Sequence, residues 1–119
     1  MLQGIVNEND EPIVSISLIL KDTSFDSPAV VDTGFNGYLS VPQKLADKSG
    51  WYFLGYEEYE IATGEKVRQK VYLGKIIFDG KEMQSYILTS KSRDVLIGTK
   101  LLKDRVLTVD FKLRKVRIT

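Results

Sequence analysis

Apolar and polar residues alternate in short runs over most of the chain, and this pattern predicts strands. In the run Ile13–Leu20, every second residue from Val14 onward is apolar, so one face of this strand would be fully apolar. Further β stretches are predicted at residues 29–31, 38–41, 51–61, 67–78, 83–88, 95–98, 106–111 and 116–119. We therefore expect an all-β protein built from many short strands.

Turn and helix signals separate these stretches. Asp79-Gly80 is a strong two-residue hairpin turn, and the polar residues 21–28 predict a hairpin loop. Residues 42–49 predict a helix, because a proline suits its first turn and a glycine follows its last residue. Residues 99–103 predict one or two further helical turns, so we expect one or two short helices in all.

The composition narrows the possible chemistry. With 119 residues the chain is expected to form a single domain over residues 1–119. The sequence contains no histidine and no cysteine, which excludes Ser–His and Cys–His catalysis, Cys/His zinc sites and disulfides. Acid–base chemistry at moderate pH then depends on carboxylates, tyrosine or lysine, and we expect no metal and no cofactor.

Charge and hydropathy point away from nucleic acid and membrane partners. The formal net charge is +1, and the longest apolar stretch, Ile13–Leu20, is too short to span a bilayer. The apolar start Met1–Val6 meets polar residues too soon for a signal peptide, so we expect a cytoplasmic protein. A basic run near the end is expected to be a solvated hairpin rather than a nucleic-acid patch: Lys112, Arg114, Lys115 and Arg117.

The strand predicted at residues 29–31 leads directly into Asp32-Thr33-Gly34. A carboxylate at the end of an apolar strand is costly to bury unless it has a use. Alone, the tripeptide is equally typical of an ordinary turn, in which the glycine supplies a positive φ. If Asp32 is catalytic as one of two carboxylates, the second must come from another chain, because the motif occurs once.

The context of this tripeptide resembles the active-site strand of the retroviral-type, or retropepsin-like, aspartic peptidases. Apolar residues precede it and Phe35-Asn36-Gly37 follows it. Val95-Leu96-Ile97-Gly98 is similar to the second hallmark of that family, and Val106–Phe111 resembles its prokaryotic, single-domain members. The resemblance covers nearly the whole chain, and it implies a closed or partly closed β-barrel.

The resemblance implies a homodimer in which each subunit supplies one Asp32 to a shared dyad. Thr33 would hydrogen-bond across the dimer interface and Gly34 would let the substrate backbone approach. Ile97-Gly98 would end a strand that crosses close behind the active-site loop. From the residues alone, Thr33 also fits a local turn bond and Gly98 fits the start of a helix.

One pair of positions departs from the family pattern. Viral relatives usually carry an aspartate and an arginine where this chain has Asn36 and Thr99. A charge-assisted pair is therefore absent, and we expect a weaker hydrogen bond in its place.

Ile61–Glu65 lies between two β stretches and resembles the flap of that family, a hairpin that closes over the substrate. Ala62, Thr63 and Gly64 would then bind peptide through their backbone. The alternative is an ordinary solvent-exposed hairpin.

Together these features predict an aspartic endopeptidase that acts on extended peptides or proteins. The main alternative is a non-catalytic peptide-binding or dimerisation module with the same fold. A third possibility, an antitoxin-like or scaffold protein with a chance Asp-Thr-Gly, predicts a monomer without a flap.

Overall fold

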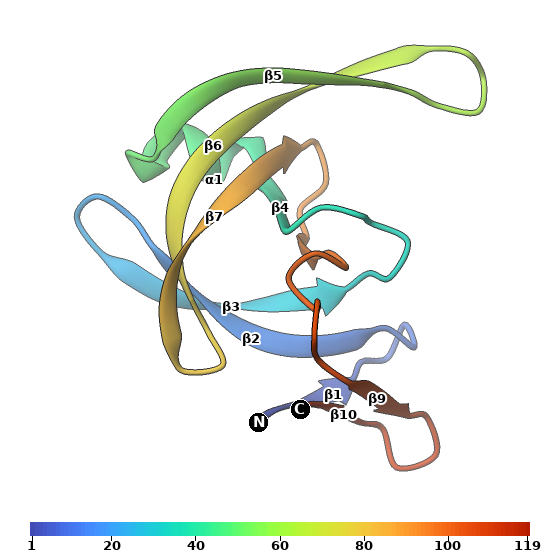
Figure 1. Ribbon diagram of the computed structural model, residues 1–119. Coiled ribbons are helices and arrows are strands. Elements are labelled where there is room, and N and C mark those ends of the chain that lie inside the picture. Colours follow the sequence, from blue (N-terminus) through green and yellow to red (C-terminus); the bar gives the residue numbers. More distant parts are fainter.

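Ten strands and one short helix make up the chain, and the computed structural model describes all residues from 1 to 119 (Figure 1). The strands are β1 (Leu2–Val6), β2 (Pro12–Ile19), β3 (Ser24–Val31), β4 (Leu39–Pro42), β5 (Tyr52–Glu60), β6 (Lys66–Phe78), β7 (Lys81–Ser90), β8 (Val95–Ile97), β9 (Leu107–Asp110) and β10 (Lys115–Ile118). The helix α1 spans Gln43–Ser49. The all-β prediction is confirmed.

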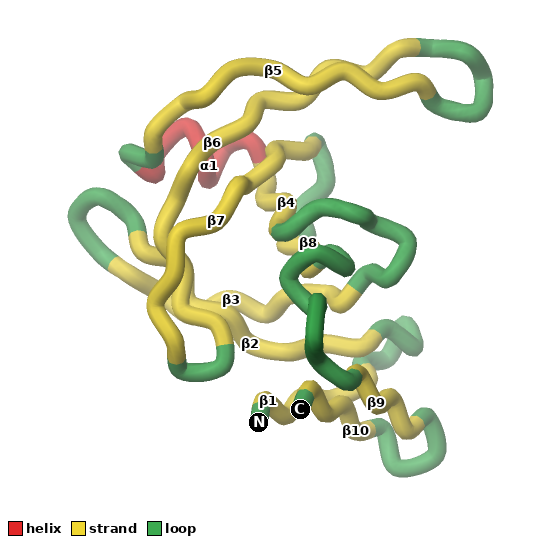
Figure 2. Tube along the Cα trace, in the orientation of Figure 1, coloured by secondary structure: helices red, strands yellow, loops and turns green.

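Six of the strands close into a barrel. The hydrogen-bonded order is β5-β6-β7-β4-β8-β3-β2-β1-β10-β9, and an additional pairing of β6 with β2 joins the two ends of the segment β6-β7-β4-β8-β3-β2. Strand β5 continues the sheet on one side, and β1, β10 and β9 continue it on the other (Figure 2). The two remaining free edges belong to β5 and β9.

The barrel interior holds the hydrophobic core. Eighteen buried apolar residues form one cluster, to which β2, β4, β6, β7 and β8 contribute fully buried side chains. In β2, Val14, Ile16 and Leu18 are at most 1% exposed, which confirms the apolar face predicted from the alternation. Each such side chain contributes about 1.5–3 kcal/mol of hydrophobic free energy.

The hairpin between β2 and β3 is tighter than the sequence predicted. Strand β3 begins at Ser24, so the expected loop over residues 21–28 is wrong and the turn is closed by Leu20 N–H donating to Thr23 O. Ser24 and Asp26 of β3 are exposed, and β8 pairs with β3 only from Ala29 onward. Pro28 is therefore tolerated in β3, because its missing N–H would have faced an unpaired edge.

The helix prediction is confirmed over residues 43–49. Pro42 precedes the first turn of α1, and Gly50 ends the helix in the left-handed conformation with φ 77°. Residues 99–103 form consecutive hydrogen-bonded turns instead of a second helix, with Leu101 N–H donating to Gly98 O and Leu102 N–H to Thr99 O. The chain thus contains one helix, and it is too short to cross a membrane.

The two predicted hairpins, β6–β7 in the middle of the chain and β9–β10 near its C-terminus, are both present. Asp79 and Gly80 both have positive φ, 53° and 77°, and join β6 to β7 as a two-residue turn. Strands β9 and β10 form the last hairpin, and its basic side chains are exposed. Strand β1 pairs with β10, which brings the two chain ends together at the foot of the molecule (Figure 1).

Candidate active site

Strands β3 and β8 run parallel and end at the same place. Val31 pairs with Ile97, and the next N–H, that of Asp32, donates to Ile97 O over 2.9 Å. Both strands are apolar and buried where they pair, so the carboxylate of Asp32 emerges at the point where the apolar segment stops. The backbones of the two strands therefore meet where each apolar run ends.

Gly98 marks the closest approach of the loop that follows β3 and the loop that follows β8. Its N–H donates to Tyr38 O over 3.0 Å, and a Cβ on Gly98 would lie 2.1 Å from Gly37 O. No side chain fits in that space. The residue therefore acts as a close-packing glycine behind the Asp32 loop rather than as a helix start, because no helix follows it.

The turn after β3 holds the carboxylate of Asp32 in place. Gly34 N–H donates to Asp32 Oδ1 over 2.9 Å, and Phe35 N–H donates to the carbonyl oxygen of Asp32 over 3.1 Å. These bonds are made by Gly34 and Phe35, so the exposed Thr33 hydroxyl does not supply the local turn bond that was one of its two interpretations. Asp32 itself is half-buried.

Asn36 and Thr99 meet across the two loops. Thr99 Oγ1 donates to Asn36 Oδ1 over 3.4 Å, so a neutral and long hydrogen bond stands at the departure from the viral pattern, as expected. Two backbone bonds join the same loops more firmly, from Thr99 N–H to Phe35 O and from Lys100 N–H to Gly37 O.

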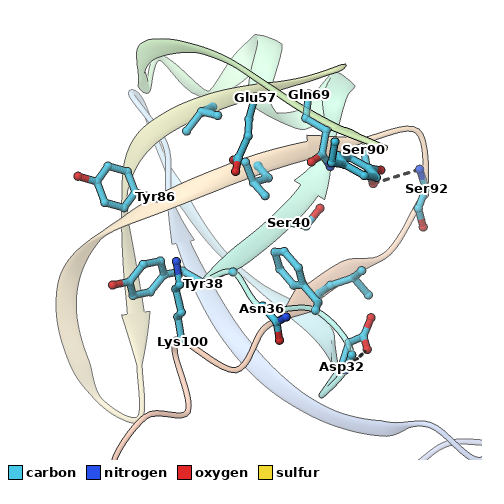
Figure 3. Close-up of a pocket in the computed structure, with 17 residues that line it drawn as sticks. Asp32, Asn36, Tyr38, Ser40, Glu57, Gln69, Tyr86, Ser90, Ser92 and Lys100 are labelled. Carbon is cyan, nitrogen blue, oxygen red and sulfur yellow. Dashed lines mark hydrogen bonds between the residues drawn. The ribbon is translucent and has the colours of Figure 1, made fainter. Parts of the chain in front are cut away.

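A cavity of about 870 Å³ lies beside Asp32 (Figure 3). Its floor is the outer face of β7, β4 and β8, where Leu88, Ser40 and Leu96 form one cross-strand row. On each strand, the residues directly before and after this row point into the core instead. Tyr38 and Tyr86 form the next row of the floor, with ring centroids 6.0 Å apart.

The roof of the cavity is the β5–β6 hairpin. Glu57 and Tyr59 of β5 face the cavity, together with Gln69 and Val71 of β6. Gln69 is fixed to the wall of the barrel, because its Nε2 donates to Thr89 O over 3.0 Å. Lys70 ties the other face of the same strand to α1 through an ion pair with Asp47.

No protein-family model and no curated protein matches the sequence. The structure is similar to solved structures. A retropepsin-like aspartic protease from Rickettsia conorii aligns over 96% of this chain and 86% of its own, with a TM-score of 0.61 and 17% identity. The Simian Foamy Virus (mac) protease aligns over 76% of this chain and 90% of its own, with a TM-score of 0.56 and 17% identity. The chain has the retropepsin-like fold.

Within this retropepsin-like fold, some of the predicted site residues meet and others do not. Asp32 and Gly34 line the cavity. Ile97 is fully buried behind them, and Gly98 is buried beside it. Thr33 is exposed next to Asp32 but outside the cavity lining.

The predicted flap residues occupy the tip of the β5–β6 hairpin. Ala62, Thr63 and Gly64 are exposed, and the tip is closed by Ile61 N–H donating to Glu65 O and Gly64 N–H donating to Ile61 O. The tip reaches past the barrel and contributes no residue to the cavity within one chain (Figure 1).

Sequence reasoning missed most of the cavity lining. No chemical motif in the sequence indicates a role in the site for these lining side chains: Tyr38, Ser40, Glu57, Tyr59, Gln69, Tyr86, Leu88, Ser90 and Lys100. A signal was present in the alternation, since the residues of β4 and β7 that do not face the core must face outward. No group of three or more metal-ligating side chains is present.

Proposed function

We propose that the protein is an aspartic endopeptidase whose catalytic dyad consists of Asp32 and the equivalent aspartate of a second copy of the chain. One observation carries the proposal: Asp32 ends a buried strand beside a cavity of about 870 Å³, with its carboxylate held by the Gly34 N–H. The similarity to two solved aspartic proteases supports it.

The chemistry needs two carboxylates that share one proton. Two carboxyl groups about 3 Å apart do not both ionise, so one stays protonated and the other acts as a base. The ionised member takes a proton from a bound water, whose oxygen attacks the scissile carbonyl carbon. The protonated member donates its hydrogen bond, and then its proton, to the carbonyl oxygen. The pair titrates as a unit with two macroscopic pKa values.

A second copy is needed because one chain holds one suitable carboxylate. The other acid of the cavity, Glu57, comes from the roof and lies away from Asp32 in Figure 3. Asp32 and the exposed Thr33 lie on the loop that would meet its own copy across a two-fold axis. The Thr33 hydroxyl is then available to hydrogen-bond across that interface.

The β5–β6 hairpin serves as the flap in this proposal. Its inner face already covers the cavity, and its tip, Ala62–Gly64, is exposed, with its hydrogen bonds inside the hairpin itself. An extended peptide would lie between this hairpin and the β7-β4-β8 floor, where backbone pairing gives affinity with little demand on sequence.

We place the enzyme in the cytoplasm.

The test compares the wild-type chain with Asp32→Asn on an unfolded protein mixture between about pH 3.5 and 7. We expect cleavage by the wild-type chain only, and sedimentation of both proteins at about 27 kDa, twice the 13.5 kDa of one chain. Asp22→Asn is the matched control, because Asp22 is an exposed acid in the β2–β3 turn.

Three outcomes would contradict the proposal. Cleavage retained by Asp32→Asn would remove the dyad as its source. Dimers of both proteins that bind unfolded peptides without cutting them would favour the alternative, a peptide-binding or dimerisation module. A monomer at all concentrations would exclude the shared site.

A further inference from the structure

Two charged side chains enter the cavity away from Asp32. Glu57 projects from the roof strand β5, and Lys100 comes from the loop that follows β8. In Figure 3, Lys100 lies beside Tyr38 and Glu57 lies on the roof between Tyr86 and Gln69, with Asp32 toward the other end of the cavity. This end is therefore chemically distinct from the surroundings of the proposed dyad.

The carboxylate of Glu57 has no partner within the chain. The four ion pairs of the protein use Asp10, Asp47 and Asp79 as their acids. The residue opposite Glu57 across the hairpin, Gln69, directs its amide group to Thr89 O instead. Glu57 thus presents an uncompensated negative charge to the cavity.

The floor of the cavity can accept a cation. The ammonium group of Lys100 lies 5.8 Å from the centroid of the Tyr38 ring, within the range of a cation–π contact. The neighbouring ring of Tyr86 carries no such cation and is 56% exposed. The cavity therefore offers a second positive group a free aromatic face on its floor and a free carboxylate on its roof.

The balance of charge in the cavity also favours a cation. Its lining contains two carboxylates, those of Asp32 and Glu57, and a single basic side chain, Lys100. Lys100 is stacked on Tyr38, so its charge is held at one wall. An acidic side chain in the same space would face Glu57 directly.

We propose that Glu57 and Tyr86 form a subsite that selects a lysine or arginine side chain of the bound peptide, at a position away from the scissile bond. The inference rests on the proposed function, because it assigns a specificity to the same cavity. The carboxylate pairs with the ammonium or guanidinium group, and the ring provides a cation–π contact.

The first experiment profiles cleavage of a library of peptides from digested, unfolded proteins by the wild-type chain, Glu57→Gln and Glu57→Lys. The wild-type chain is expected to prefer lysine or arginine at one substrate position. For a peptide pair with lysine or norleucine at that position, Glu57→Gln should lower the ratio of the two kcat/KM values about five- to tenfold. Glu57→Lys should move the preference to aspartate or glutamate.

Glu58→Gln is the matched control. Glu58 is the next residue of the same strand, so it lies on the opposite face of the hairpin and lines no part of the cavity. The Glu58→Gln substitution removes the same charge from β5 without touching the subsite, so the lysine preference should be unchanged. Because the ion pair is partly exposed, the wild-type preference should also weaken as salt is raised.

A binding arm separates this inference from the proposed function. Binding of the lysine and norleucine peptides is measured to Asp32→Asn, with and without Glu57→Gln. If nothing is cleaved, the peptide library itself is used in their place. Lysine- or arginine-dependent binding that requires Glu57 supports the subsite even if the wild-type chain cleaves nothing, in which case only the proposed function fails. Cleavage or binding without a Glu57-dependent cation preference, or no peptide binding at all, overturns the subsite.

Discussion

At the scale of single residues, Gly98 is the position at which the site tolerates least change. A Cβ there would lie 2.1 Å from Gly37 O and 2.8 Å from the Phe35 ring. We expect Gly98→Ala to push the two loops apart and to cost about 1–3 kcal/mol of folding free energy. Urea denaturation would measure this loss, and displacement of Asp32 should reduce cleavage by the folded fraction as well.

Gly80→Ala gives the comparison for that loss. Nothing lies within 4 Å of a Cβ at Gly80, so the cost there comes from its positive φ of 77° alone, at about 1–2 kcal/mol. It should leave cleavage by the folded protein unchanged. Equal activity of Gly98→Ala and Gly80→Ala would argue against the close approach at Gly98.

Asp79 makes the stability of the protein depend on pH. The hydrogen bond from Arg105, with an Nη1–Oδ2 distance of 2.9 Å, lowers the pKa of Asp79 below its ordinary value of 3.8. Because the pKa of Asp79 is lower in the folded than in the unfolded state, its ionised carboxylate stabilises the fold at any pH above the unfolded-state pKa. This contribution is lost as the pH falls through the lower, folded-state pKa. Asp79→Asn should therefore be less stable than the wild-type chain near pH 7, and the difference should shrink as the pH falls below 3.8.

The asparagine variant keeps the turn, because Asn-Gly is as suitable as Asp-Gly for two residues with positive φ. Urea midpoints of both proteins at several pH values would provide the measurement. Asp104→Asn, at another position with positive φ (65°), is the control and should change stability little at any pH. A stability difference for Asp79→Asn that is as large at pH 2.5 as at pH 7 would contradict the role of the charge.

At the scale of elements, the β5–β6 hairpin is the part expected to move. Gly64 closes its tip with φ 86°, and alanine is strained there by about 1–2 kcal/mol. The tip is exposed and its hydrogen bonds lie within the hairpin, so it can rearrange locally to relieve this strain. Gly64→Ala should therefore affect peptide cleavage or binding severalfold and cost less folding free energy than Gly80→Ala. The comparison is again Gly80→Ala, a turn glycine with similar φ in a hairpin away from the cavity. An equal effect of the two variants on cleavage would contradict a flap role.

Most elements were predictable from local patterns, because alternation and turn residues act over a few positions. The β6–β7 hairpin and α1 were found for this reason. The start of β3 was missed since Lys21–Pro28 is polar, and only its pairing with β2 makes that segment a strand. Local propensity gave no indication of this tertiary pairing.

The candidate site was predictable only in part, for a related reason. Asp32 and Gly98 carry signals of their own, a carboxylate and a glycine at the ends of apolar runs. Alternation places Tyr86 on the outward face of β7, but neither Tyr86 nor Glu57 carries a chemical signal of its own, because their role depends on which strands lie side by side. The barrel closes through β6 and β2, a pairing that joins segments about sixty residues apart.

At the scale of the whole molecule, the proposal requires that the active unit be a pair of chains. Asp32→Asn provides a direct test when it is mixed with the wild-type chain. Random pairing at equal amounts leaves about one quarter of the dimers with two aspartates, so activity should fall to about one quarter of that of an equal total amount of wild-type protein. Independent active sites in single chains would leave one half.

The mixture must be equilibrated long enough for subunits to exchange, and this can be followed by mass spectrometry with one isotope-labelled partner. The Asp22→Asn chain serves as the control, since it should assemble equally well and leave the activity undiminished. Dilution adds an independent measurement, because activity per chain should fall once the concentration drops below the dimer dissociation constant. One-half activity in a fully exchanged mixture, together with no effect of dilution, would exclude a dyad shared between subunits.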